Sequence, residues 1–169
     1  MIRRVASRPV EEPKPKPTTA KILILQRMCD LSQGGRYTED DIEKFINPLF
    51  RPEEMILRSN KDSLSIGSID SDLKLDYRLK SIIDRNLIWP LHAVIRRLPN
   101  GNFAIVDNSR YGTYVMYKRV QGEVILDNGD IICFGYPYGD TILPGQQLGP
   151  FYSDVKYIAC IGDITEKHD

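Results

Sequence analysis

Short apolar runs separated by turn residues dominate the chain from residue 55 onward. The runs span four to eight residues and read MILRS, DSLSIG, DLKL, HAVIRRL, NFAIVDN, TYVMYKRV, GEVIL, IICFG and VKYIACIG. An earlier run, KILILQRM (21–28), has the same character. Asn and Gly tolerate positive φ, so 99–101 (PNG) and 127–130 (DNGD) are tight turns. Many short strands joined by turns predict an antiparallel β-sandwich.

One segment shows helical periodicity instead. Thr38 is a natural N-cap, and the acidic residues 39–41 complement the positive end of a helix dipole. Ile42, Phe45 and Ile46 fall at i, i+3 and i+4, which forms one apolar stripe. The pattern predicts one short helix at about 38–47, within an insertion at about 30–54 between the first two strands. Its apolar stripe is a candidate partner surface.

The organisation of the chain follows from composition. Residues 1–20 contain four prolines and few apolar residues, which is typical of an extended tail. We expect one folded domain over 21–164, since 169 residues suffice for a single core, and a short tail at 165–169.

Charge and cysteine usage narrow the function classes. The 23 basic and 23 acidic residues give zero net charge, which argues against non-specific nucleic-acid binding. No run approaches the roughly 18 apolar residues of a membrane span, and the first residues lack the apolar core of a signal peptide. Cys29, Cys133 and Cys160 have no metal-like spacing, so we expect no metal and no cofactor. The expected location is the nucleus or the cytoplasm.

Five motifs in a fixed order resemble the forkhead-associated (FHA) domain. They are SIG (65–67), DLKL (72–75), PLHAVI (90–95), NFAIVDNSRYGTYV (102–115) and LDNGDIICFG (126–135). The resemblance covers about 55–135. It implies a mainly β fold: a sandwich of two twisted, mostly antiparallel sheets, here with the one inserted helix. It also implies a non-enzymatic protein–protein interaction module, of the adaptor kind, whose loops at one end of the sandwich hold phosphothreonine peptides.

The family's ligand-contacting residues are replaced in this chain. The family's arginine after the first glycine corresponds to Ser68. In the family, a serine stands three residues before the histidine, and an arginine directly follows that serine. The corresponding residues here are Trp89 and Pro90. The asparagine before Gly-Thr corresponds to Tyr111. A serine hydroxyl cannot supply the charge-assisted fork of a guanidinium, so the resemblance implies that the usual grip on phosphothreonine is missing.

The residues that brace the loops in the family are retained. They are Gly67, His92, Gly112 and Thr113. The loops that we expect to meet a partner carry Ser68, Arg85, Trp89, Ser109, Arg110, Tyr111 and Thr113.

Three functions remain open. The favoured prediction is a module that binds another protein or peptide independently of the usual phosphothreonine contacts, through the loops, the helix stripe, or a sheet face that also allows a homodimer. The alternative is a phosphothreonine reader rebuilt around Arg85, Ser109 and Arg110. A remote alternative is a β-sandwich enzyme centred on His92, with no second internal histidine to assist it.

Overall fold

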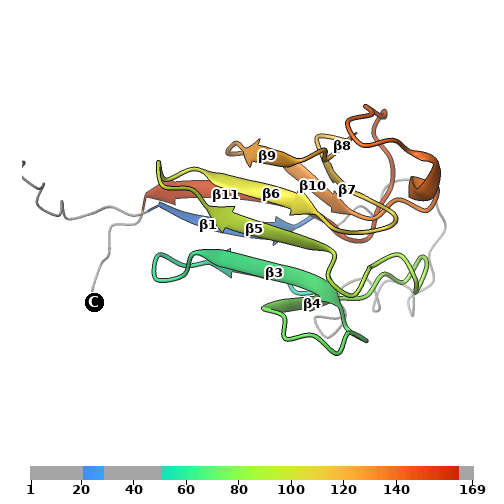
Figure 1. Ribbon diagram of the computed structural model, residues 1–169, viewed down its shortest axis with the longest axis horizontal. Coiled ribbons are helices and arrows are strands. Elements are labelled where there is room, and N and C mark those ends of the chain that lie inside the picture. Colours follow the sequence, from blue (N-terminus) through green and yellow to red (C-terminus); the bar gives the residue numbers. More distant parts are fainter. Residues whose placement is uncertain (1–20, 29–50, 164–169) are drawn as a thin grey trace, which may run out of the picture.

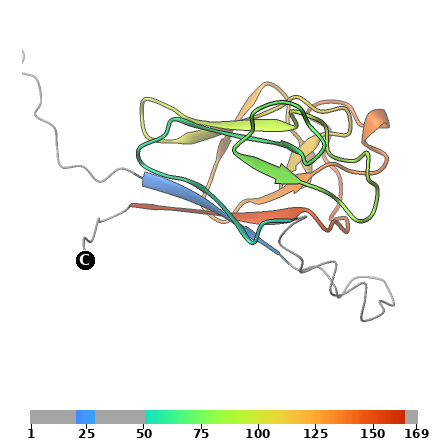
Figure 2. The same cartoon turned by 90° about the horizontal axis from the view of Figure 1, so that it is seen from below.

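The computed structural model describes residues 21–28 and 51–163, which form two β-sheets packed face to face (Figures 1 and 2). One sheet has the strand order β2-β1-β11-β10-β7-β8. These strands are β1 (Lys21–Arg27), β2 (Glu54–Leu57), β7 (Thr113–Val115), β8 (Lys118–Arg119), β10 (Ile131–Phe134) and β11 (Lys156–Asp163). The predicted mainly β sandwich is confirmed.

The second sheet has the order β4-β3-β5-β6-β9. Its strands are β3 (Ser63–Ser68), β4 (Tyr77–Leu79), β5 (Ala93–Arg97), β6 (Phe103–Asp107) and β9 (Glu123–Leu126). Within the described part of the chain β3 and β4 pair in parallel, whereas the other strand pairs are antiparallel.

Alternation along the strands builds the core between the sheets. Successive side chains of a strand point to opposite faces, so Leu23 and Leu25 of β1 enter the core together. Ile66 of β3, Ile95 of β5 and Ile105 of β6 meet them from the other sheet, and all five are fully buried. The apolar positions that the sequence pattern identified therefore become the surface on which the sheets pack.

The short run at 72–75 does not form a strand. The chain pairs with β3 only at β4, which begins at Tyr77. The preceding segment bonds to a side chain instead: the Arg78 guanidinium donates to the carbonyl oxygens of Ser71 at 2.8 Å and Leu73 at 2.6 Å. Carbonyls held by this guanidinium are turned away from a strand ladder, so 72–75 stays a loop.

The predicted run at 113–120 is divided into β7 and β8 by a two-residue turn. Met116 and Tyr117 adopt φ of 52° and 66°, an uncommon conformation for residues other than glycine. Two contacts compensate: Gln147 donates its amide to the Met116 carbonyl at 3.0 Å, and the Tyr117 ring packs at 5.3 Å from the ring of Phe151.

The predicted helix at 38–47 and the tails at 1–20 and 165–169 lie outside the described residues. Within the described ranges, helical structure is confined to a 3-10 turn, η1 (Gly139–Thr141), and no helix is long and apolar enough to cross a membrane. The loops after β3, before β5 and after β6 gather at the end of the sandwich that lies on the right in Figure 1, together with η1.

Candidate functional site

Three loops enclose a pocket of about 350 Å³ at that end of the sandwich. Ser68 at the end of β3 and Asp70 in the β3–β4 loop line the pocket, and the segment between β4 and β5 contributes Arg85. The β6–β7 loop contributes Arg110 and Tyr111. Residues from three separate parts of the sequence therefore line one pocket. Hydrogen bonds and ion pairs hold each of these loops in position.

His92 ties two of these loops together. The backbone N–H of Trp89 donates to Nδ1 of His92 at 3.0 Å, so that nitrogen carries a lone pair. The proton is then on Nε2, which donates to the carbonyl oxygen of Gly112 at 2.9 Å. Burial lowers the pKa of His92 from 6.5 to about 4, so the ring is neutral at pH 7. Both ring nitrogens are engaged and the side chain is fully buried, which leaves no free nitrogen for catalysis.

Gly67 allows the β3–β4 loop to lie directly against the segment before β5. A Cβ at this position would overlap the carbonyl oxygen of Pro90. The N–H of Ser68, the next residue, donates to the carbonyl oxygen of Trp89 at 3.0 Å. The N–H of His92 donates to the carbonyl oxygen of Ile66 at 2.9 Å. These backbone contacts close one wall of the pocket.

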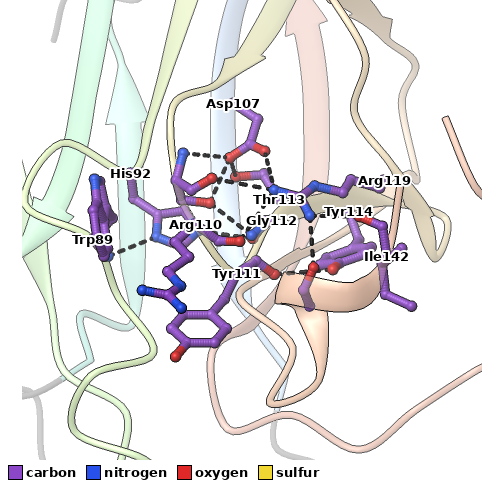
Figure 3. A network of polar contacts seen from close by, with 12 residues as sticks. Trp89, His92, Asp107, Arg110, Tyr111, Gly112, Thr113, Tyr114, Arg119 and Ile142 are labelled. Atoms are coloured by element: carbon purple, nitrogen blue, oxygen red, sulfur yellow. Dashed lines mark hydrogen bonds and ion pairs between the residues drawn. The ribbon is translucent and has the colours of Figure 1, made fainter. Parts of the chain in front are cut away.

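Asp107 organises the β6–β7 loop (Figure 3). Its Oδ1 accepts from the Ser109 N–H at 3.0 Å, the Ser109 hydroxyl at 2.6 Å and the Thr113 hydroxyl at 2.9 Å. The Ser109 hydroxyl also accepts from the Gly112 N–H at 2.8 Å. The hydroxyls of Ser109 and Thr113 are therefore committed to the loop, and Thr113 is fully buried and inaccessible to a ligand.

Arg119 fastens this loop to the segment around η1. One Nη donates to the carbonyls of Gly139 and Ile142, both at 2.7 Å. The other donates to the carbonyls of Ser109 at 3.2 Å and Arg110 at 3.3 Å (Figure 3). Its charge lies 3.5 Å from the Asp107 carboxylate, so one guanidinium joins loops from two regions of the chain.

Asp154, which precedes β11, anchors the segment that carries Arg85. Its carboxylate accepts from the Ser81 hydroxyl and from the Ile82 N–H, both at 2.7 Å. Its Oδ2 also lies 3.2 Å from Nη1 of Arg51, and both side chains are fully buried. Burial lowers the pKa of Arg51, and the Asp154 carboxylate partly offsets this effect.

The structure thus separates the residues that sequence reasoning selected. Arg85, Trp89, Arg110, Tyr111 and Ser68 face the pocket, and Trp89 is 39% exposed. The side chains of Ser109, Thr113 and His92 support the loops from within. The stripe at positions 42, 45 and 46 lies outside the described residues.

Sequence reasoning missed the residues that hold the loops from elsewhere in the fold: Arg78, Arg119 and Asp154. No local motif marks them, because Arg78 and Arg119 bond mainly to backbone carbonyls, and the Ser81 and Ile82 partners of Asp154 lie 73 and 72 positions away. Within the described part of the chain, no group of three or more His, Cys, Asp or Glu side chains is placed to hold a metal ion.

Comparisons with known proteins agree with the resemblance. The family model of the FHA domain matches residues 64–135 and confirms the resemblance over that segment. No curated protein matches the chain.

Solved FHA structures are also similar to this chain. The N-terminal FHA domain of Rad53p from S. cerevisiae, in complex with a phosphothreonine peptide, is 21% identical, with a TM-score of 0.45, covering 83% of this chain and 93% of that one. The FHA domain of CT664 from Chlamydia trachomatis is 14% identical (TM-score 0.47; 85% and 99% covered). Mycobacterium tuberculosis EmbR, in complex with a low-affinity phosphopeptide, is 19% identical (TM-score 0.47; 86% and 26% covered).

Proposed function

We propose that this chain, whose residues 64–135 match the FHA domain, is a non-enzymatic interaction module that binds phosphorylated peptides in the pocket between its loops. The main observation in favour of the proposal is that Arg85 and Arg110 line the same pocket. They approach from two different loops into a pocket that is also lined by Ser68, Trp89 and Tyr111, where the resemblance implies that contact residues are replaced. The FHA family is a non-enzymatic interaction module, and the buried, fully bonded His92 supports the same class here.

The chemistry of the two arginines suits a phosphate. A phosphorylated residue carries about −1.5 to −2 charge and three strong acceptor oxygens, which a guanidinium fork can engage. Neither Arg85 nor Arg110 takes part in an ion pair between described residues. The Arg110 guanidinium lies 5.7 Å from the centre of the Tyr111 ring, which orients it without neutralising it.

Trp89 and Tyr111 give the same pocket aromatic walls. Aromatic side chains at a pocket rim are effective anchors for a peptide, because they offer a large contact area at a low cost in conformational entropy. The pocket therefore combines two cations for a phosphate with two rings for the neighbouring peptide chain.

Paired titrations test the proposal. A degenerate phosphothreonine peptide pool and its unphosphorylated twin are titrated into the protein, with Trp89 fluorescence and calorimetry as readouts. We expect saturable binding of the phosphorylated pool alone, weakened by salt. Arg85→Ala and Arg110→Ala should each weaken it at least about tenfold, because each removes charge-assisted hydrogen bonds.

Arg96→Ala is the matched control, since Arg96 is an exposed arginine on β5 outside the pocket. It should bind as tightly as the wild type. Equal binding of both peptide pools would contradict the proposal and would favour the phosphate-independent partner predicted from the sequence, which stays a prediction.

A further inference from the structure

The proposed peptide pocket contains a carboxylate that phosphate binding does not use. Asp70 lines the pocket together with Arg85 and Arg110. None of the ion pairs between described residues includes any of these three side chains. One anion and two cations thus share a hollow of about 350 Å³ without neutralising one another.

The loop that carries Asp70 is held in place by hydrogen bonds. The Asp70 N–H donates to the Ser68 hydroxyl at 3.1 Å, and the Ser71 N–H donates to the Ser68 carbonyl at 3.0 Å. Arg78 holds the same loop from β4 through the carbonyls of Ser71 and Leu73. These bonds therefore hold the backbone that carries Asp70 at the pocket wall.

A carboxylate at this position changes which ligand suits the pocket. The two guanidiniums attract a phosphate dianion, whereas Asp70 repels it. A ligand that carries only the phosphate leaves the carboxylate without an opposite charge. A ligand that carries the phosphate and a nearby cation matches all three charges, and such complementarity is a general source of specificity.

We propose that Asp70 makes the pocket selective for phosphopeptides that carry a lysine or an arginine close to the phosphorylated residue. This inference rests on the proposed function and names the class of peptide that the module takes. Asp70 contacts the basic residue of the peptide, while Arg85 and Arg110 contact the phosphate.

Three phosphothreonine peptides test this assignment. They are identical except at one position flanking the phosphothreonine, which is Arg, Gln or Glu, and a second set varies the position on the other side. Calorimetry at low ionic strength should rank Arg above Gln above Glu in one of the two sets. The Arg peptide should bind about three- to fivefold more tightly than the Gln peptide, as for an exposed ion pair.

Two variants isolate the carboxylate. In Asp70→Asn the three affinities should converge, because the charge that distinguishes the peptides is gone. Asp72→Asn is the matched control: Asp72 is an exposed aspartate of the same loop that does not line the pocket, so the wild-type ranking should persist. Equal melting temperatures would exclude an effect on folding.

Several results would overturn the inference. If Asp70→Asn raised the affinity for all three peptides by one common factor, Asp70 would only repel the phosphate. An unchanged ranking in Asp70→Asn, or equal binding of the three peptides by the wild type in both sets, would remove the inference and leave the proposed function standing. Failure of every phosphopeptide to bind the wild type would remove the proposed function as well.

Discussion

Both ends of the sandwich use charged side chains that bond to backbone groups, but the pocket end adds a fully buried ion pair between Arg51 and Asp154. At the opposite end the half-buried Arg97 donates to the carbonyls of Lys21, Arg58 and Lys61. At the pocket end, Arg78, Arg119 and Asp154 each hold one loop. At the opposite end, the 98–102 turn closes through the Gly101 N–H donating to the Leu98 carbonyl at 2.8 Å. The 127–130 turn closes through the Asp130 N–H donating to the Asp127 carbonyl at 3.1 Å, and it also bonds to β11 through the Gly129 N–H donating to the Ala159 carbonyl at 2.7 Å.

The difference teaches how a loop surface becomes a recognition site. A hairpin turn holds its shape by local bonds and needs little from the rest of the fold. Loops that must meet around a ligand have to be fixed relative to one another, and buried polar bonds achieve this at the expense of desolvating charges. The pocket end, with its buried ion pair, should therefore be the more sensitive of the two ends to single changes far from the pocket.

The largest effect should come from Asp154→Ala. This change removes the carboxylate that neutralises the buried Arg51 and holds Ser81 and Ile82. We expect the free energy of unfolding, measured by urea denaturation, to fall by about 3–5 kcal/mol, as for a broken buried ion pair.

The control for Asp154→Ala is Arg96→Gln. The side chains of Arg96 and its partner Glu123 are 49% and 36% exposed, and exposed ion pairs contribute little to stability. This variant should unfold at a denaturant concentration close to that of the wild type. Similar losses in the two variants would contradict the contrast between buried and exposed charge.

A second, smaller effect should appear as a pH dependence of stability. Burial disfavours the imidazolium and lowers the pKa of His92 from the usual 6.5 to about 4 in the fold. As the pH falls below about 6.5, the unfolded chain binds a proton that the folded chain does not. The free energy of unfolding should therefore fall by about 1.4 kcal/mol per pH unit, or about 3 kcal/mol by pH 4.

His92→Asn provides the comparison for this titration. The variant starts from a lower stability, so the quantity to compare is the slope between pH 6.5 and 4. We expect the slope to be shallower than in the wild type. Equal slopes would mean that other groups, and not the histidine that joins the pocket loops, are responsible for the loss.

The sequence was sufficient for the sandwich because strands and turns depend on local patterns. Alternating apolar residues and the PNG and DNGD turns predict short strands, and the order of motifs predicts the family. The missed strand β4 pairs with β3 across the loop that Arg78 holds, and the turn at Met116 and Tyr117 depends on contacts with Gln147, 31 positions away, and with Phe151. Local propensity carries no information on such partners.

Local sequence patterns also limit what could be predicted of the site. Arg85 and Arg110 stand out in the sequence because both lie in loops, although only the fold places them in one pocket. The pairing of Arg51 with Asp154 joins residues 103 positions apart. One sequence gives no means of choosing that partner among the other acidic residues, so this support of the pocket came only from the structure, whereas the resemblance had already implied His92 and Thr113.

The smallest effect should come from Gly101→Ala at the opposite end. Gly101 has a φ of 92°, and a Cβ there would meet no atom within 4 Å, so the change adds only backbone strain of about 1 kcal/mol. Phosphopeptide affinity and Trp89 fluorescence should stay at wild-type values. Gly67→Ala is the counterpart at the pocket end: its Cβ would overlap the Pro90 carbonyl, so stability, affinity and Trp89 fluorescence should all change. If Gly101→Ala weakened binding as much as Gly67→Ala, the two ends would be coupled, and the open space around Gly101 would no longer explain its tolerance.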